Sequence, residues 1–216
     1  MDKLPQRKVI IMYGGSYNPP LCSHFAIAQQ ALDEFEQVEK VVFVPVNKKY
    51  PKDGLLDNEH RYNMLSLVAK KNLKFDVSRI EIDSDRSLYT FETLRLLREQ
   101  YNNYDIWFMV GTDNLKMFDT WKNQEELLSY YKMLVVERDD DLLAEIISGD
   151  KILLQYKDSL VTVKNSINTN MSSTFVRQQL ESGKSIKYLT TDEICEYIKR
   201  NNLYSKYYDK NRHTDK

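Results

Sequence analysis

Two short segments of the chain carry side chains that suit the binding of phosphate groups. The first has a pair of glycines, Gly14 and Gly15, at the end of an apolar run, followed by a turn with two prolines and then by His24 near the start of a helical pattern. A strand, a turn and a helix N-terminus form an anion site, because free backbone N–H groups and the helix dipole point toward the same place. His24 adds a side-chain donor. This segment therefore predicts a nucleotide-phosphate site.

The second segment has three consecutive hydroxyl side chains at the start of a helical pattern. Ser172 is a good N-cap residue, and Ser173 and Thr174 offer donors beside the free backbone N–H groups. Arg177 follows one turn later, so its guanidinium can bind the same anion through two hydrogen bonds. Two helix N-termini with such side chains point toward a triphosphate.

The glycine pair does not belong to the common nucleotide-binding fingerprints. The G-x-G-x-x-G spacing is missing after Gly14 and Gly15, and no Gly-Lys-Ser/Thr triplet follows that would make a P-loop. Taken alone, the first segment also fits an ordinary strand-to-helix turn, and the second fits a simple helix cap. The phosphate prediction depends on both segments occurring in one chain.

Strands and helices alternate along the chain, which predicts an α/β fold, a doubly wound Rossmann-like and mostly parallel sheet with a small helical C-terminal part. Ligands in such sheets bind outside the carboxyl ends of the strands. Gly14, Gly15 and Gly111 fall at such ends, where a glycine lets a ligand approach the backbone. We expect strands over about 8–13, 41–44, 77–82, 106–110 and 133–136, one or two more within 152–163, and helices over about 20–35, 60–71, 90–101, 142–147, 172–181 and 192–201.

The bulk composition excludes several classes of protein. The 31 basic and 32 acidic residues give a net charge of −1, so the chain lacks the excess of positive charge that binding to nucleic acid or to an anionic membrane requires. No apolar run approaches the ~20 residues of a membrane span, and residues 1–12 lack the features of a signal peptide. Cys22 and Cys195 cannot build a disulfide framework or a structural zinc site by themselves. We therefore expect a soluble cytoplasmic protein, with a nuclear location as the alternative.

The domain organisation follows from length and from the lack of linkers. The 216 residues contain no internal repeat and no Pro/Gly/Ser-rich linker, and they are enough for one substantial core. We expect a single domain over residues 1–204 and a polar, mobile tail over residues 205–216. The sequence leaves a homo-oligomer open.

The two phosphate segments together resemble the paired signatures of the nucleotidyltransferase superfamily, written (H/T)xGH and ISSTxxR. More closely, the chain is similar to the nicotinate/nicotinamide mononucleotide adenylyltransferases of NAD biosynthesis, from about residue 8 to residue 206. The further likeness lies in Val44-Pro45-Val46-Asn47 with Lys52 and His60-Arg61, in Tyr89-Thr90-Phe91-Glu92-Thr93-Leu94, in Gly111-Thr112-Asp113 with Trp121, and in an ending with Gly183, Tyr188 and Tyr204.

This resemblance implies an enzyme that transfers AMP from ATP to nicotinate or nicotinamide mononucleotide and releases pyrophosphate. It implies Mg²⁺ carried on the ATP phosphates, so that no metal-binding cluster of side chains is expected. His24 and Arg177 are implied as catalytic residues. The implied ATP-binding residues are Gly14, Gly15, Ser16, Tyr17, His24, Lys52, Gly111, Asp113, Ser173, Thr174 and Arg177, and the implied pyridine-binding residues are Thr90, Thr93 and Trp121.

Some of these assignments have plain structural alternatives. Trp121 also fits core packing, and Lys52 also fits a solvated loop that includes the weaker phosphate candidates Lys48 and Lys49. Asp113 fits either a ribose contact or a metal-linked polar network. The residues do not decide between nicotinate and nicotinamide.

One departure from the family pattern bears on activity. Leu21 stands where the first motif has histidine or threonine, and Ser23 stands where it has glycine. Leucine cannot donate to a phosphate, and the loss of one such donor commonly costs about 10²–10³-fold in rate. A weak or inactive nucleotide-binding or regulatory protein therefore stays open, as does a sister phosphopantetheine adenylyltransferase or a cytidylyltransferase. The sister enzymes should lack the ring site of Thr90 and Trp121.

Overall fold

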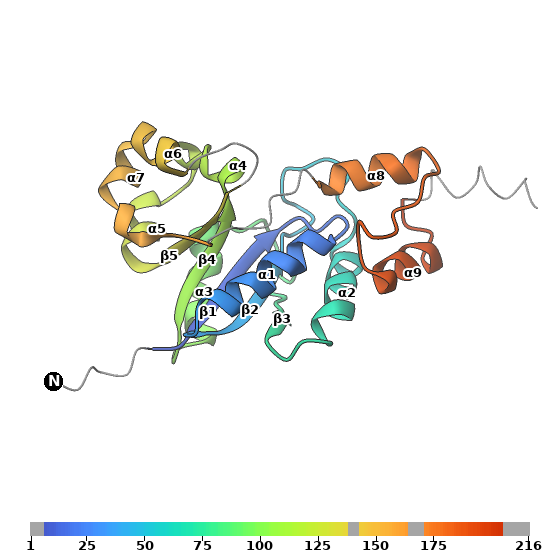
Figure 1. The fold of residues 1–216 in the computed structure, drawn as a ribbon, viewed down its shortest axis with the longest axis horizontal. Coiled ribbons are helices and arrows are strands. Elements are labelled where there is room, and N and C mark those ends of the chain that lie inside the picture. Colours follow the sequence, from blue (N-terminus) through green and yellow to red (C-terminus); the bar gives the residue numbers. More distant parts are fainter. Residues whose placement is uncertain (1–6, 138–142, 164–170, 205–216) are drawn as a thin grey trace, which may run out of the picture.

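The computed structural model describes residues 7–137, 143–163 and 171–204 (Figure 1). In these ranges six strands form one sheet in the order β3-β2-β1-β4-β5-β6, and every neighbouring pair is parallel. The chain thus winds outward from β1 to one edge, crosses back, and winds outward again from β4. The strands are β1 Val9–Gly15, β2 Val38–Pro45, β3 Phe75–Val77, β4 Asp105–Gly111, β5 Lys132–Val136 and β6 Leu160–Thr162.

Helices cover both faces of this sheet. The side chains of Ile11 and Tyr13 pack with α1, α2, α8 and α9, whereas those of Ile10 and Met12 pack with the helices from α3 to α7. Figure 1 shows α5, α6 and α7 at one end of the molecule and α8 and α9 at the other. The α-helices are α1 Cys22–Glu34, α2 Asn58–Ala69, α3 Thr90–Gln100, α4 Thr112–Leu115, α5 Gln124–Tyr130, α6 Leu143–Gly149, α7 Lys151–Gln155, α8 Ser173–Glu181 and α9 Asp192–Arg200, and the 3₁₀ helices are η1 Phe118–Thr120 and η2 Lys157–Ser159.

The apolar runs explain why β1 lies at the centre. A parallel strand covered on both faces has no solvent side, so nearly every residue in it is apolar. In β1, Tyr13 lies between Phe43 of β2 and Met109 of β4, and all three side chains are buried. The predicted α/β class with a mostly parallel sheet and a small helical C-terminal part is confirmed.

Two expectations about local structure are wrong. The strand predicted over 77–82 ends at Val77, because the Asn47 side-chain amide binds the carbonyl oxygens of Glu81, Ile82 and Ser84 and replaces a strand partner. The segment 152–163 begins with α7 instead of a strand. The helix α7 forms here because its N-cap, Asp150, has a carboxylate that accepts hydrogen bonds from the first N–H groups of the helix. Only β6 in that segment is a strand, and α4 and α5 were not expected at all.

The remaining expectations about the chain concern its ends and its surroundings. The predicted tail over 205–216 lies outside the described residues, and the single domain through residue 204 and the cytoplasmic location stay predictions. Within the described ranges, none of the helices has the length and the apolar stretch that crossing a bilayer requires.

Candidate active site

A cavity of about 550 Å³ lies at the carboxyl ends of β1 and β4. The chain leaves these neighbouring strands toward opposite edges of the sheet, and this switch point is where open α/β sheets bind ligands. With the exception of Thr93, every residue that the sequence predicts for the site lines this cavity: Gly14, Gly15, Ser16, Tyr17, His24, Lys52, Thr90, Gly111, Asp113, Trp121, Ser173, Thr174 and Arg177.

The loop after β1 is shaped by an aromatic side chain folded back under it. Tyr17 has a left-handed backbone (φ 47°), its ring is buried, and its hydroxyl donates a 2.6 Å hydrogen bond to the carbonyl of Tyr13. A Cβ added at Gly15 would lie 3.0 Å from the Tyr17 ring. The glycine at position 15 therefore makes room for the protein's own tyrosine, in addition to any ligand.

His24 is oriented by the backbone of the residue that departs from the family pattern. The Leu21 N–H donates a 3.0 Å hydrogen bond to Nδ1 of His24, which leaves the proton of the neutral imidazole on Nε2. The Leu21 side chain is buried in the core beside α1. Leucine at this position thus removes a side-chain donor but keeps the backbone contact that sets the histidine tautomer.

Arg177 joins the second phosphate segment to the first. Its Nη1 donates a 2.7 Å hydrogen bond to the carbonyl of Asn18, and its Nη2 donates a 3.0 Å bond to the Thr174 hydroxyl. The Ser173 hydroxyl donates to the carbonyl of Pro19 at 2.8 Å. As predicted, Ser172 is the N-cap of α8, and its hydroxyl accepts from a backbone N–H one turn on. The two candidate phosphate-binding segments therefore line one cavity.

Asn18 makes hydrogen bonds to three distant segments, and the sequence alone did not predict this role. Its side-chain nitrogen donates to the Gly54 carbonyl at 2.8 Å, and its side-chain oxygen accepts from the Tyr204 hydroxyl at 2.8 Å. Burial raises the pKa of Tyr204 although the charges of Arg177 and Arg61 oppose this, so the hydroxyl stays protonated and donates. The C-terminal segment is thereby tied to the loop after β1.

Arg61 is a second residue that the functional prediction missed. It is fully buried, and its guanidinium donates to the carbonyls of Ser16, Val46 and Leu56 at 2.6–3.1 Å and to the side chain of Asn58. The sequence feature that could have indicated a role for Arg61 is the His60-Arg61 pair, which is part of the family resemblance. Arg61 holds the loop after β1 against the loop after β2.

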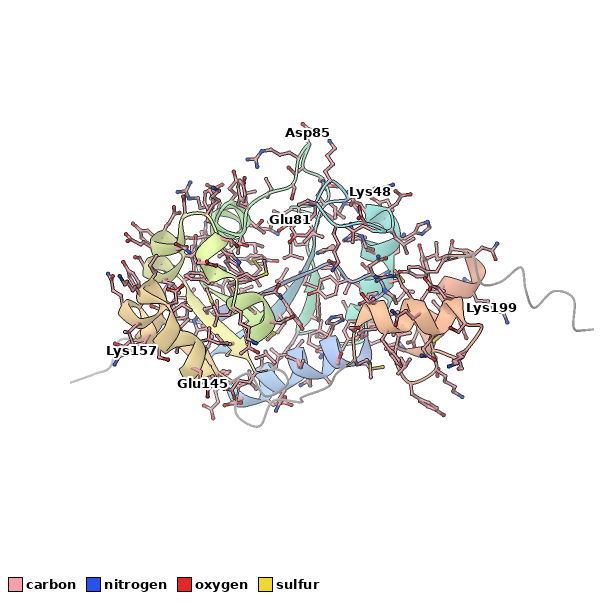
Figure 2. All side chains as sticks on the ribbon, turned by 90° about the horizontal axis from the view of Figure 1, so that it is seen from above. Lys48, Glu81, Asp85, Glu145, Lys157 and Lys199 are labelled. Atoms are coloured by element: carbon pink, nitrogen blue, oxygen red, sulfur yellow. The ribbon has the colours of Figure 1, made fainter. Side chains whose placement is uncertain are left out.

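Lys52 is the lysine of its loop that reaches the cavity. Its Nζ donates to the Ser16 hydroxyl at 3.1 Å, and its pKa is lowered by burial and by the charge of Arg177, with Asp113 acting in the opposite direction. The weaker candidates do not line the cavity, because Lys48 pairs with Asp57 and Lys49 donates to the Asp85 carbonyl. Figure 2 shows Lys48 and Asp85 toward the outer edge of the molecule.

Trp121 and Thr90 line the cavity from elements that carry no predicted phosphate ligand. Trp121 packs against the rings of Phe108 and Phe118, with centroids 5.7 and 5.4 Å away, and is still partly exposed. The Trp121 side chain therefore both packs in the core and lines the cavity. A ring that enters the cavity would find an aromatic face and a threonine hydroxyl here.

Thr93, in contrast, is fully buried and does not reach the cavity. Its hydroxyl donates a 2.8 Å hydrogen bond to Oε1 of Glu81, and Glu81 does line the cavity. Burial raises the pKa of Glu81 to about 7, although the Thr93 hydroxyl, the charge of Arg61 and the backbone N–H of Asn47 all lower it. The sequence prediction missed Glu81; its only signal was a glutamate between Ile80 and Ile82.

The described residues contain no group of three or more His, Cys, Asp or Glu side chains that would hold a metal ion by themselves. Asp113 lies on the cavity wall, close enough to Lys52 to affect its pKa. Mg²⁺ in nucleotide enzymes is typically held by one or two carboxylates and by substrate phosphates. The donor set therefore fits a Mg²⁺ ion that arrives with a triphosphate.

Known proteins with similar sequences cover most of the chain. The cytidylyltransferase-like family model matches residues 12–179. A protein of Caldicellulosiruptor bescii named a probable nicotinate-nucleotide adenylyltransferase is 31% identical over 91% of this chain and 99% of its own length. A protein of Flavobacterium johnsoniae with the same name is 32% identical over 90% of this chain and 98% of its own length.

A solved structure has the same fold. It is the nicotinic acid mononucleotide adenylyltransferase of Plasmodium falciparum complexed with NaAD, with a TM-score of 0.73, 20% identity, and coverage of 92% of this chain and 98% of that one. At this identity the likeness concerns the fold alone. On the sequence matches, the chain belongs to the cytidylyltransferase-like family and, within it, groups with the nicotinate-nucleotide adenylyltransferases.

Proposed function

We propose that this protein transfers AMP from ATP to nicotinate or nicotinamide mononucleotide, giving the dinucleotide and pyrophosphate as a step of NAD biosynthesis. The names of its relatives support the reaction, and the composition of the cavity supports the two substrates. Cationic and hydroxyl side chains suit a triphosphate, whereas Trp121 and Thr90 suit a pyridine ring.

One observation carries this proposal: the hydrogen bond from Arg177 to the Asn18 carbonyl. It brings the N-terminus of α8 against the loop that precedes α1, so that two helix N-termini face one cavity. Each contributes the positive end of a helix dipole. Such an arrangement fits a ligand with several linked phosphates better than a single anion.

The mechanism needs positioning and charge stabilisation more than a protein nucleophile. The 5′-phosphate oxygen of the mononucleotide attacks the α-phosphorus of ATP, the bond from that phosphorus to the bridging oxygen breaks, and pyrophosphate leaves. We assign the Nε2–H of His24 to the α-phosphate and the guanidinium of Arg177 to the β- and γ-phosphates, with Lys52 as a further donor. The hydrogen bond from His24 and the positive charges of Arg177 and Lys52 stabilise the developing negative charge on the transferred and leaving groups.

The remaining site residues have supporting roles in this proposal. Gly14, Gly15 and Gly111 let the nucleotide approach the strand ends, while Ser16, Tyr17, Ser173 and Thr174 line the phosphate path. Asp113 is assigned to a ribose or to the bound metal. Mg²⁺, when bound with ATP, neutralises phosphate charge.

Leu21 does not favour the non-catalytic alternative. The family donor at this position is lost, but His24 keeps its tautomer through the Leu21 backbone N–H. We therefore expect turnover, at a rate lowered by at most the about 10²–10³-fold that one phosphate donor contributes.

The test is a substrate panel with the purified protein and Mg²⁺. ATP with each pyridine mononucleotide is compared with ATP plus phosphopantetheine and with CTP plus a phosphorylated alcohol. Dinucleotide and pyrophosphate in equal amounts, in the pyridine reactions alone, support the proposal. Product from either of the other pairs supports a sister enzyme, and ATP binding without any product supports a regulatory protein.

Two lysines of the same loop allow a test of whether this cavity is the ATP site. Lys52 lines the cavity, whereas Lys48 lies on the same loop and pairs with Asp57 outside it. We expect Lys52→Ala to raise the KM for ATP about tenfold or more, the worth of one charge-assisted hydrogen bond. Lys48→Ala should leave that KM within about twofold, because exposed ion pairs contribute little. Equal effects of the two changes would argue against this cavity as the ATP site.

A further inference from the structure

Glu81 is a buried carboxyl group on the cavity wall that the proposed chemistry does not use. Its side chain is 5% exposed, and it lines the cavity together with Leu88, Thr90 and Trp121. Figure 2 shows Glu81 inside the molecule, whereas Lys48 and Asp85 lie farther out. A carboxyl group with so little contact with water is costly in its ionised form unless it is paired.

The carboxyl group of Glu81 is held by two neighbouring residues, Thr93 and Asn47, on the wall of the cavity. Oε1 accepts from the Thr93 hydroxyl at 2.8 Å, and the backbone carbonyl accepts from Asn47 at 3.0 Å. The backbone N–H of Asn47 also acts on the carboxyl group of Glu81. Because Glu81 itself lines the cavity, this carboxyl group is within reach of a bound ligand.

No positive charge is paired with this carboxyl group among the described residues. Arg61 of α2 is the cation that affects it, but its guanidinium donors are directed to the carbonyls of Ser16, Val46 and Leu56. The groups that act on Glu81 are thus Thr93 from α3, Arg61 from α2 and Asn47 from the loop after β2. Burial outweighs all three, so the neutral form is accessible near neutral pH.

The position of Glu81 relates it to the ring-binding residues. Thr93, its hydrogen-bond donor, lies one turn after Thr90 on α3, and Thr90 lines the cavity. The candidate phosphate ligands come from other elements, namely the β1–α1 loop, α1, the loop between β2 and α2, and α8. A pyridine mononucleotide held by Thr90 and Trp121 would bring the substituent on its ring to the same cavity wall as Glu81.

We propose that Glu81 is a specificity-determining residue that recognises the acid or amide group on the pyridine ring through its own protonation state. When protonated, the carboxyl group of Glu81 donates a hydrogen bond to the carboxylate of nicotinate mononucleotide. When ionised, it accepts from the carboxamide N–H of nicotinamide mononucleotide and repels the carboxylate. This inference rests on the proposed function, and it makes the choice between the two substrates depend on pH.

The measurement is the ratio of kcat/KM for nicotinate mononucleotide to kcat/KM for nicotinamide mononucleotide, from about pH 6 to about pH 8. Ionisation of His24, of Lys52 and of the substrate phosphates affects both reactions and cancels in the ratio. If only the protonated form accepts the acid, the ratio falls at least about tenfold over this interval, centred near pH 7, and it falls by up to about a hundredfold if only the ionised form accepts the amide.

Glu81→Gln is the decisive variant because it keeps the shape and removes the titration. The Thr93 hydroxyl would donate to the amide oxygen, so the amide N–H₂ would face the cavity as a permanent donor. The ratio should then stay constant with pH, at or above its acidic wild-type value. Thr93→Val should shift the wild-type midpoint to higher pH, since the hydroxyl favours the ionised form. Glu196→Gln, on the exposed side of α9, is the control and should keep the wild-type profile.

The outcomes separate this inference from the function on which it rests. A wild-type ratio that does not change with pH overturns the role of Glu81, and so does a Glu81→Gln enzyme that retains the wild-type slope. In both cases dinucleotide is still made, so the proposed function stands. If the wild-type protein makes dinucleotide from neither substrate, the proposed function fails, and the role of Glu81 fails with it.

Discussion

Arg177 in α8 donates a 2.7 Å hydrogen bond to the backbone carbonyl of Asn18, which lies 159 residues earlier in the chain. This contact places a guanidinium from one end of the sequence beside the loop that follows the first strand. Because Thr174 accepts a second hydrogen bond from the same guanidinium, the orientation of Arg177 is set before any ligand arrives. Preorganised donors of this kind act on charge that develops during reaction without a cost of reorganisation.

Arg177→Ala should lower kcat/KM by about 10²–10³-fold, because a charged donor to the triphosphate is lost. The free energy of unfolding should change little, since the Arg177 side chain is only partly buried. Steady-state kinetics and urea unfolding measure the two effects. Arg200→Ala, at the exposed end of α9, is the control and should match the wild type in both. Kinetics within about threefold of the wild type would show that Arg177 does not contact the phosphates.

His24→Ala should abolish measurable turnover, or lower it by about 10²–10³-fold, with ATP binding largely kept. The reason is that the Nε2–H, set by the hydrogen bond from the Leu21 N–H to Nδ1, is assigned to the transition-state charge. His60→Ala is the matched control: His60 contacts the Tyr197 hydroxyl from α2 and does not line the cavity. If both variants lose the same activity, a general effect on the fold is the explanation.

The sequence was sufficient for the parts of the site that local chemistry determines. The apolar run of β1, the capping serine Ser172 and the glycines at strand ends are each recognisable within a few neighbouring residues. The family likeness then related segments that are distant in the sequence. Thirteen of the fourteen predicted site residues line one cavity for these reasons, with Thr93 as the exception.

The parts that were missed depend on contacts between distant segments. Asn18 was not recognised because its role comes from Gly54 and Tyr204, at sequence separations of 36 and 186 residues. The false strand over 77–82 has the same origin, since the Asn47 amide satisfies that backbone from another loop. Glu81 lies in the same segment, and the alternating pattern there gives no sign that its side chain lines the cavity.

Tyr204→Phe should raise the KM for ATP about threefold to tenfold and leave the KM for the mononucleotide unchanged. The change removes the hydrogen bond to the Asn18 side chain, and Asn18 in turn positions the carbonyl that Arg177 contacts. The free energy of unfolding should fall by about 1 kcal/mol, the net worth of one hydrogen bond. Tyr188→Phe is the control, because Tyr188 is 78% exposed. A rise in both KM values, or in neither, would contradict a positioning role.

The free energy of unfolding should fall as pH rises from about 4.5 to about 7, with Glu81 as a main cause. The folded protein holds the Glu81 proton up to about pH 7, whereas the unfolded chain releases it near the ordinary value of 4.5. In this window the unfolded state binds fewer protons, so the contribution of Glu81 decreases with pH, by about 3 kcal/mol in total. Glu81→Gln should remove this component. Urea unfolding at about pH 5 and about pH 8 gives the difference; equal pH dependence in both proteins would place the cause elsewhere.

The central claim is that the two phosphate-binding segments, joined at Asn18 and Arg177, form one site for AMP transfer. The most direct measurement is the product balance of the purified protein with ATP, Mg²⁺ and nicotinate mononucleotide. The account predicts one dinucleotide and one pyrophosphate for each ATP consumed, and the loss of both products in His24→Ala. ATP that is bound but not consumed, or that is split into AMP and pyrophosphate without dinucleotide, would contradict it.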